Sequence, residues 1–182
     1  MKLKLKNVRL AFPQLFEAKA VSGDDKAAFS ANFLIDPIDP QVKGINDAIE
    51  QVAKEKWGAK ADTMLKQLRA ADKTALHNGD SKAQYDGFAG NLFISARSTI
   101  RPLVLNTDKT PLTASDGKPY SGCYVNATLE LYGQDNSYGK RINAVLGGVQ
   151  FYRDGDAFAG GRAASEDDFD DVSEGATADD LA

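Results

Sequence analysis

Hydrophobic and polar residues alternate along several segments of the chain, which is the pattern of half-buried β-strands. The first alternation changes phase after Lys6-Asn7, and its apolar positions are Leu3, Leu5, Val8, Leu10 and Phe12. Because a slip of one residue would turn every later side chain to the opposite face, we expect a β-bulge near Lys6-Asn7. The same alternation predicts further strands at 27–35, 91–98, 123–132 and 141–153.

A helical period replaces the alternation in one region. Asp39 can cap a helix that begins at Pro40, and Gly58 is a typical stop. The apolar stripe of this helix consists of Val42, Ile45, Ile49, Val52 and Trp57. A shorter helix is expected to about Ala71. The remaining segments are predicted loops at 72–90 and 106–121 and a hairpin connection at 133–139.

This order of elements indicates a fold class. Strands, then helices, then more strands, without regular β–α alternation, argue against a doubly wound sheet. We expect a mainly β protein with a helical insertion, built as a curved five-stranded barrel like the oligonucleotide/oligosaccharide-binding (OB) fold. Such a barrel needs large apolar side chains inside, and the candidates are Phe12, Phe16, Phe29, Phe33 and Phe151.

The faces that point away from this core carry aromatic and basic residues. In strand 123–132, Tyr124 and Tyr132 alternate with the apolar row. Cross-strand packing or a covering helix would account for their position. The alternative is a platform on which unpaired bases stack, typically worth ~1–3 kcal/mol per base. The candidate DNA-binding residues are Phe93, Arg97, Arg101, Tyr124, Tyr132, Lys140, Arg141, Tyr152 and Arg153.

Charge is distributed unevenly along the chain. Its 22 Lys and Arg and 26 Asp and Glu give a net charge of −4, but eight of the acids follow Arg162, after which no Lys or Arg occurs. Residues 1–164 therefore hold 22 basic and 18 acidic residues, a net charge of +4. We expect a basic domain at 1–164 and a disordered acidic tail at 165–182. Such asymmetry is typical of proteins that contact nucleic acid.

Several classes of chemistry lack the residues they need. One cysteine and one histidine cannot form an internal disulfide, a zinc site or a Cys/His catalytic pair. Cys123 is expected to be a buried small hydrophobe, and His77 a solvent-exposed loop residue. No catalytic residue, metal or cofactor is predicted. No stretch approaches the roughly 20 apolar residues of a membrane span, and the N-terminus lacks the apolar core of a secretory signal, so a cytoplasmic protein without membrane contact is expected.

Four segments of the chain resemble the single-stranded DNA-binding proteins of tailed bacteriophages, a family long described as a domain of unknown function. They are AFPQLFEA (11–18), FAGNLFISARS (88–98), YSGCYVNATLELYGQDNSYGKRINA (120–144) and GVQFYRDGDAFAGGR (148–162). The resemblance implies an OB fold, non-catalytic coating of single-stranded DNA, and an acidic tail that tempers binding and recruits replication or recombination proteins. The matching positions would be Arg97, Tyr124, Tyr132, Lys140, Arg141 and Tyr152.

The leading hypothesis is therefore a phage-encoded, sequence-independent single-stranded DNA-binding protein of DNA replication, recombination or repair, in the host cytoplasm. Its tail would compete with DNA and present partners with Asp167, Asp168, Phe169, Asp170 and Asp171. The alternative is an OB-like protein-interaction module that does not bind nucleic acid. A nuclease or another DNA enzyme is a third hypothesis. The sequence leaves open whether the chain forms a homo-oligomer.

Overall fold

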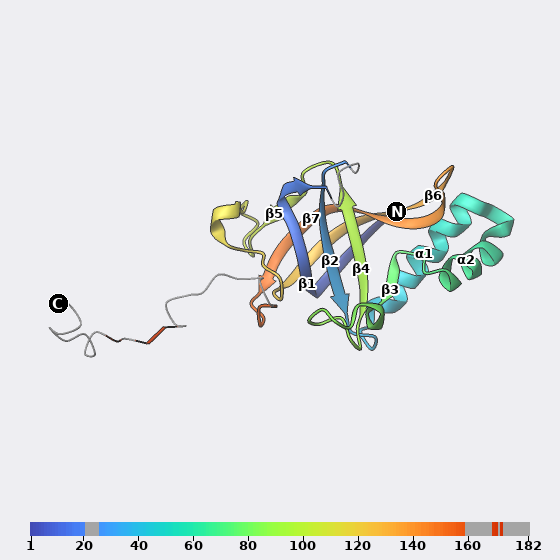
Figure 1. Ribbon diagram of the computed structural model, residues 1–182. Helices are drawn as coiled ribbons and strands as arrows, with labels where there is room; N and C mark the ends of the chain where they lie inside the picture. The colour runs from blue at the N-terminus through green and yellow to red at the C-terminus, as the bar shows by residue number, and fades with distance from the viewer. Residues whose placement is uncertain (21–25, 159–168, 171, 173–182) are drawn as a thin grey trace.

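The computed structural model describes residues 1–20, 26–158, 169, 170 and 172. Its elements follow the expected order, with the short strands β3 and β5 in addition (Figure 1). They are β1 (Lys2–Lys19), β2 (Ala28–Ile35), α1 (Gln41–Trp57), η1 (Gly58–Lys60), α2 (Ala61–Ala70), β3 (Leu76–Asn78), η2 (Gly79–Lys82), β4 (Leu92–Ser98), β5 (Leu103–Leu105), η3 (Ala114–Asp116), β6 (Tyr124–Asn136) and β7 (Gly139–Arg153).

Five strands close into a barrel in the order β1-β2-β4-β7-β6, with β6 returning to β1. Neighbouring strands are antiparallel except β4 and β7, which run parallel and meet at the pair Arg97 and Val145. β3 pairs with β4, and β5 pairs with β7, outside this ring. The helices form an insertion between β2 and β4. The prediction of a mainly β, five-stranded OB-like barrel with a helical insertion is confirmed.

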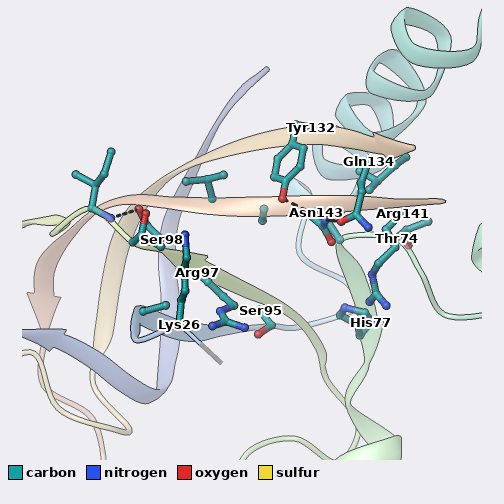
Figure 2. Close-up of a pocket in the computed structure, with 17 residues that line it drawn as sticks. Lys26, Thr74, His77, Ser95, Arg97, Ser98, Tyr132, Gln134, Arg141 and Asn143 are labelled. Carbon is teal, nitrogen blue, oxygen red and sulfur yellow. Dashed lines mark hydrogen bonds between the residues drawn. The ribbon is translucent and has the colours of Figure 1, made fainter. Parts of the chain in front are cut away.

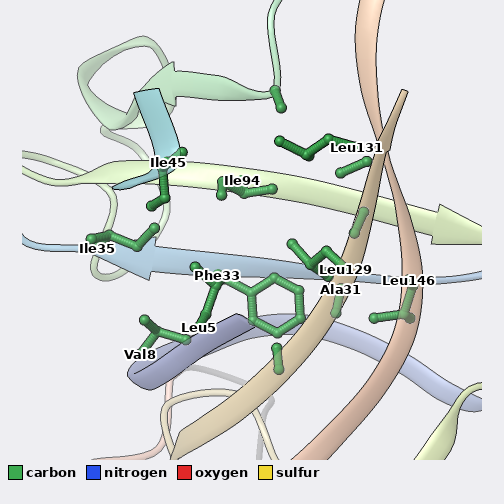
Figure 3. Close-up of a cluster of buried hydrophobic side chains, with 14 of the residues drawn as sticks. Leu5, Val8, Ala31, Phe33, Ile35, Ile45, Ile94, Leu129, Leu131 and Leu146 are labelled. Atoms are coloured by element: carbon green, nitrogen blue, oxygen red, sulfur yellow. The ribbon is translucent and has the colours of Figure 1, made fainter. Parts of the chain in front are cut away.

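The core lies inside the barrel, where the inward-facing rows of the strands meet (Figure 3). Phe33 of β2, Ile94 of β4 and Leu131 of β6 are among its fully buried side chains. Ile45 and Ile49 of α1 belong to the same cluster, so one face of the helix is part of the barrel core. Burial of these aliphatic and aromatic groups is the main stabilising contribution to the fold.

The long strand β1 is irregular at two places. The expected bulge is confirmed as a register shift between Leu5 and Val8, with Asn7 in the left-handed region at φ 51°. A second shift lies between Ala11 and Gln14 on the β2 side, where Phe12 has a φ of 48°. The prediction of Phe12 as a core residue is wrong: its side chain is 46% exposed because this second bulge turns it outward.

The other predicted phenylalanines lie as expected. Phe29, Phe33 and Phe151 are buried, and Phe16 is partly buried against the core. The outward lysines Lys2, Lys4 and Lys6 are all exposed on β1.

The helical region follows its sequence signals closely. The Asp39 carboxylate accepts a hydrogen bond from the Gln41 amide at 2.9 Å, which satisfies one of the free N–H groups at the start of α1. Ile45, Ile49 and Val52 form the buried face of α1. Gly58 ends the helix with a positive φ of 56°, which costs a glycine little. α2 then packs beside α1 (Figure 1).

Two predicted loop segments contain more regular structure than expected. The segment 72–90 includes β3 and η2. His77, predicted to be solvent-exposed, lies in β3 with a side chain only 15% exposed, and its Nδ1 is 2.7 Å from an Asp72 carboxylate oxygen. That prediction is wrong because β3 adds to the edge of β4. The predicted hairpin connection at 133–139 is shorter, since β6 continues to Asn136 and β7 begins at Gly139.

After β7 the chain folds back against the barrel, and we call residues 154–158 the C-terminal strap. The Phe158 amide donates to the Ser121 carbonyl at 3.0 Å. The Arg9 guanidinium donates to the carbonyl oxygens of Gly122 (3.0 Å) and Asp156 (2.7 Å). The strap approaches Gly122 so closely that a Cβ there would collide with the Asp156 carbonyl oxygen. The Arg9 side chain therefore joins the strap to the segment at Gly122 and holds residues 154–158 against the barrel.

Candidate nucleic-acid interface

A groove with a volume of about 680 Å³ opens on the barrel where β4, the start of β2 and the β6–β7 hairpin meet (Figure 2). We call it the Arg97 groove. Its lining consists of Lys26, Ala28, Thr74, Ala75, His77, Ser95, Arg97, Ser98, Thr99, Ile100, Tyr132, Gln134, Arg141, Ile142, Asn143, Ala144 and Val145.

Strand alternation places the polar side chains of this groove. On β4, Ile94 and Ala96 are fully buried, so Ser95 and Arg97 project outward. On β7, burial of Ile142 and Ala144 likewise leaves Arg141 and Asn143 in the groove lining. The parallel pairing of Arg97 with Val145 brings these two rows together. The groove is therefore a consequence of how the barrel closes.

Among the described residues, three cationic side chains line the groove: Lys26, Arg97 and Arg141. Over the part of the chain that the structure describes, none of the three forms an ion pair, and no carboxylate belongs to the groove lining. Unpaired cations in a concave surface concentrate positive potential there. A phosphate backbone is the kind of ligand whose charge this arrangement can neutralise.

Tyr132 supplies an aromatic ring at the edge of the groove and is 44% exposed. The Asn143 amide group donates to the Tyr132 hydroxyl at 3.2 Å and to the Gln134 side-chain oxygen at 2.8 Å (Figure 2). These bonds restrain the phenol and leave nearly half of the side chain open to solvent. A restrained, exposed ring beside cations is the combination that stacks on bases of single strands.

The position of the groove matches the place where OB barrels bind oligonucleotides. In this fold the ligand face is formed by the second and third barrel strands and by the loops between strands 1 and 2 and between strands 4 and 5. Those strands are here β2, which supplies Ala28 to the groove, and β4, which supplies Ser95, Arg97 and Ser98. Lys26 comes from the first of these loops, and Arg141 lies on β7 shortly after the turn from β6. The position of the Arg97 groove on the barrel and its cationic lining thus both indicate a nucleic-acid interface.

Of the nine domain residues predicted to bind DNA, the structure brings three into this groove: Arg97, Tyr132 and Arg141. Arg101 follows β4 just beyond the lining residues Thr99 and Ile100, with its guanidinium 5.8 Å from the Phe29 ring centroid. Lys140 lines a different depression, between the hairpin and α2.

Three further predicted residues gather at the other end of the β6–β7 ladder. Tyr124 is paired with Arg153, whose guanidinium lies 3.7 Å from the centre of the tyrosine ring. Tyr152, the neighbour of Arg153, is about half exposed. Tyr124 and Arg153 form a separate aromatic and cationic pair, and the Arg97 groove includes neither them nor Tyr152.

Phe93 requires a correction. It lies on the outward face of β4, as expected, but its side chain is only 3% exposed. The rings of Phe88 and His77 lie 5.1 Å and 5.0 Å from it, and Leu34 belongs to the same buried cluster. The segment that precedes β4 thus covers this end of the face, so the ring is not available to stack on a base.

Of the predicted tail residues, Phe169 and Asp170 are exposed. Asp167, Asp168 and Asp171, and the expectation of disorder for the tail, lie outside the described residues.

Sequence reasoning missed several groove residues. Lys26 lies two positions before the first residue of the aromatic-rich strand β2, and a positive charge at that place was the signal that could have identified it. His77 reaches the groove through the unpredicted strand β3. Outside the groove, sequence reasoning also missed Tyr138, which is 91% exposed at the tip of the β6–β7 hairpin, within the segment predicted as a connection.

The structure offers little for nucleophilic or metal chemistry in the part that it describes. Cys123 is buried as predicted, and burial raises the pKa of its thiol to about 11, so it is protonated near neutral pH. Within the described ranges no group of three or more His, Cys, Asp and Glu residues is arranged to hold a metal ion. The helices described there include none that is long and apolar enough to cross a membrane.

Comparison with known protein sequences gives one family and a close relative. The sequence model of the family described as "Enterobacter phage Enc34, ssDNA-binding protein" matches residues 1–182. Putative protein p50 of Acyrthosiphon pisum secondary endosymbiont phage 1 is 52% identical over 176 residues, which cover 95% of this chain and 95% of p50.

Solved structures give the same picture. The single-stranded DNA-binding protein from bacteriophage Enc34, in complex with single-stranded DNA, matches with a TM-score of 0.73 and 28% identity, over 86% of this chain and 88% of that chain. The single-stranded DNA-binding protein gp2.5 of bacteriophage T7 matches with a TM-score of 0.56 and 14% identity, over 98% and 97% of the two chains. The second likeness concerns the fold alone.

Proposed function

Because the chain belongs to the family of the Enterobacter phage Enc34 single-stranded DNA-binding protein, we propose that it binds single-stranded DNA in the Arg97 groove without reading the base sequence. The family expected from the sequence is confirmed. One observation carries the assignment to this groove: Lys26, Arg97 and Arg141 line it without an ion-pair partner among the described residues, next to the exposed ring of Tyr132.

Each type of side chain has a distinct role in this proposal. Arg97, Arg141 and Lys26 contact phosphates, which supplies affinity that does not depend on base identity. Tyr132 stacks on a base, and because every base has a π-face this contact also tolerates any sequence. Ser95 and Asn143 supply neutral hydrogen-bonding groups on the groove floor.

The other candidates extend this surface. Arg101 continues the cationic track beyond the end of β4, and Lys140 adds a charge on the hairpin. Tyr124, Tyr152 and Arg153 form a secondary contact site for a longer strand, although Arg153 covers one face of Tyr124 at 3.7 Å. Phe93 has no direct contact with DNA, because it is buried.

The biochemical role is to coat single-stranded DNA during phage DNA replication, recombination or repair in the host cytoplasm, without catalysis. Residues 1–164 are the binding domain, and residues 165–182 are a regulatory tail. The eight acids of this tail compete with DNA for the cationic groove, and Asp167, Asp168, Phe169, Asp170 and Asp171 present a motif to replication or recombination proteins.

Fluorescence anisotropy with a labelled oligothymidine of ~16 nucleotides tests the proposal, since single OB folds cover ~4–16 nucleotides. Across a salt series, the logarithm of the association constant should fall against that of the salt concentration with a slope of about −0.7 per neutralised phosphate. Equal affinity for oligomers of different sequence is expected. If neither the full chain nor a chain ending at residue 164 binds at low salt, the proposal is wrong and the protein-interaction hypothesis takes its place.

A further inference from the structure

Two aromatic rings outside the Arg97 groove lie together on the surface of the barrel. Phe12 of β1 and Tyr85, which follows η2, are 46% and 44% exposed. Their ring centroids are 5.0 Å apart at an interplanar angle of 83°, an edge-to-face pair. The buried ring of Phe88 lies 5.9 Å from Phe12 and 6.1 Å from Tyr85. The protein therefore holds both rings in place while almost half of each side chain stays open to solvent.

The backbone at Phe12 is held in an unfavourable conformation. A φ of 48° is rare for a bulky residue without a short polar side chain. It occurs where the β1–β2 register shifts between Ala11 and Gln14, and bulges of this kind re-aim a side chain. Strained positions of this kind are concentrated at binding sites. Here the bulge turns a phenylalanine away from the barrel core, where burial would have been favourable, and exposes it on the surface.

The ring pair is continuous with the Arg97 groove across the sheet. Ala11, Asn32 and Ser95 are direct neighbours on β1, β2 and β4, which lie side by side (Figure 1). Because adjacent strands are about 4.8 Å apart, Ser95 in the groove lies roughly 10 Å from Ala11, the residue before Phe12. Asn32 faces outward between them, since Ala31 and Phe33 are fully buried. The row between groove and ring pair thus consists of Ser95, the partly exposed Asn32 and Ala11, which is buried against Phe88 and Phe93.

A cation and an unsatisfied polar atom lie along this connection. The Lys82 ammonium is 5.1 Å from the ring centre of Phe93, which shares its face of β4 with Ser95, and the Lys82 carbonyl accepts the Tyr85 amide at 3.0 Å. The Asn32 side-chain oxygen is buried, and within the described residues it has no hydrogen-bond partner. A buried polar atom of this kind is costly unless something else satisfies it.

We propose that Phe12 and Tyr85 form a second stacking site for unpaired bases, on the same strand that occupies the Arg97 groove. The strand leaves the groove at Ser95, crosses Asn32 with a phosphate near Lys82, and places one or two bases against the ring pair. This inference rests on the proposed function, because the groove supplies the first contacts. Two features favour DNA over a protein partner: the ring pair and the groove lie on adjacent strands of one sheet, and the segment that carries Tyr85 also places the Lys82 ammonium over Phe93, between the two sites.

Oligomer length separates this second site from the first. Anisotropy is measured with labelled oligothymidines of ~6 and ~16 nucleotides, short and long relative to the OB site size. Replacement of both rings (Phe12→Leu with Tyr85→Leu) should weaken binding of the long oligomer by about tenfold and leave the short one unchanged. Arg97→Ala should weaken both. Equal loss for the two lengths, or no loss for either, would overturn the second site.

Conservative variants exclude a folding effect. Tyr85→Phe keeps the ring and should bind the long oligomer like the unaltered chain, whereas Tyr85→Leu alone should already weaken it. Thermal unfolding of each variant is followed in parallel, and because Tyr85 lies in a surface segment, Tyr85→Leu remains informative if the double variant does not fold. Photocross-linking of a 5-iodouracil oligomer should modify Phe12 or Tyr85 only at the longer length. If the unaltered chain bound no DNA at all, the proposed function itself would be wrong, and not only the second stacking site.

Discussion

The Arg153 guanidinium lies 3.7 Å from the ring centre of Tyr124, and the Arg9 guanidinium lies 5.6 Å from the same centre. Tyr124 therefore already has cationic partners from the protein, in contacts of the kind that stabilise exposed pairs by about 0.5–1 kcal/mol. Tyr132 on the same strand has no cation over its ring among the residues that the structure describes, and it is 44% exposed. The two tyrosines, which the sequence pattern treats alike, are thus unequal as sites for a base.

This inequality gives a comparison of two substitutions. Tyr132→Ala should weaken oligothymidine binding by ~1–3 kcal/mol, the usual value of one stacked base, and Tyr132→Phe should retain most of the affinity although it loses the bond from Asn143. Tyr124→Ala should weaken DNA binding less and lower the unfolding free energy more. Anisotropy and urea unfolding of the three variants provide the measurements. A larger loss of affinity for Tyr124→Ala than for Tyr132→Ala would reverse the assignment.

The cations of the Arg97 groove should determine the salt dependence of binding. Arg97→Ala and Arg141→Ala each remove one phosphate contact, so each should reduce the magnitude of the log–log salt slope by about 0.7. Lys66→Ala on α2 removes the same charge from an exposed site outside the groove and serves as the matched control. A slope for the two arginine variants equal to that of the lysine variant would place the phosphate contacts elsewhere.

Removal of the acidic tail should raise the affinity for single-stranded DNA. A chain ending at residue 164 loses eight carboxylates and keeps the domain charge of +4. Because the competing polyanion is gone, the dissociation constant should fall, most clearly at low salt where charges are least screened. Anisotropy of both chains over the same salt series measures the difference. Unchanged or lower affinity of the shortened chain contradicts competition by the tail.

Gly122 and Gly117 form a matched pair for the C-terminal strap. Both have a positive φ, 107° and 70°, so alanine is strained at either position. A Cβ at Gly117 meets open space, whereas one at Gly122 collides with the Asp156 carbonyl oxygen. Gly122→Ala should therefore lower the unfolding free energy in urea clearly more than Gly117→Ala, by roughly a further 1–3 kcal/mol, as for overpacked sites. Equal losses would show that the strap moves aside freely.

The single thiol reports on the barrel interior. Burial raises the pKa of Cys123 to about 11 from an ordinary value near 9. Since the folded-state pKa is the higher one, the associated stability is fully present below pH 9 and is lost as the pH rises toward 11. A thiol reagent at pH 8 should label the protein only after denaturant is added. Between pH 9 and 11, the unfolding free energy of the Cys123→Ala variant should fall less steeply than that of the unaltered chain. Rapid labelling of the native protein would contradict this burial.

The barrel could be predicted because the alternation of apolar and polar residues in each strand identifies the side chains that face the core. In β6, Val125, Leu129 and Leu131 are all buried as the alternation required. The bulge at Asn7 was equally visible, because an alternation that changes phase keeps one face buried only if the strand gains an extra residue there. Helix signals at Asp39 and Gly58 are local, and the structure confirms both.

The wrong predictions have two physical causes. A neighbouring segment can cover an outward-facing side chain, and a second bulge can turn an inward-facing side chain toward solvent. Phe93 is outward on its strand, and only the approach of Phe88 and His77 makes it buried. Phe12 is apolar and in phase with Leu10, yet the second bulge turns it outward. Arg97 and Arg141 line one groove because β4 and β7 pair over a long sequence separation, which alternation within one strand does not encode.

The barrel ring closes between β4 and β7 through a single registered pair, Arg97 with Val145. With so few backbone bonds to break, amide protons here should exchange with solvent through smaller opening motions than those of the long β6–β7 ladder. An oligonucleotide held by Arg97 and Arg141 would contact both sides of this junction at once. Since a ligand stabilises only the state that it binds, saturation should slow exchange most at this junction and raise the melting temperature with ligand concentration.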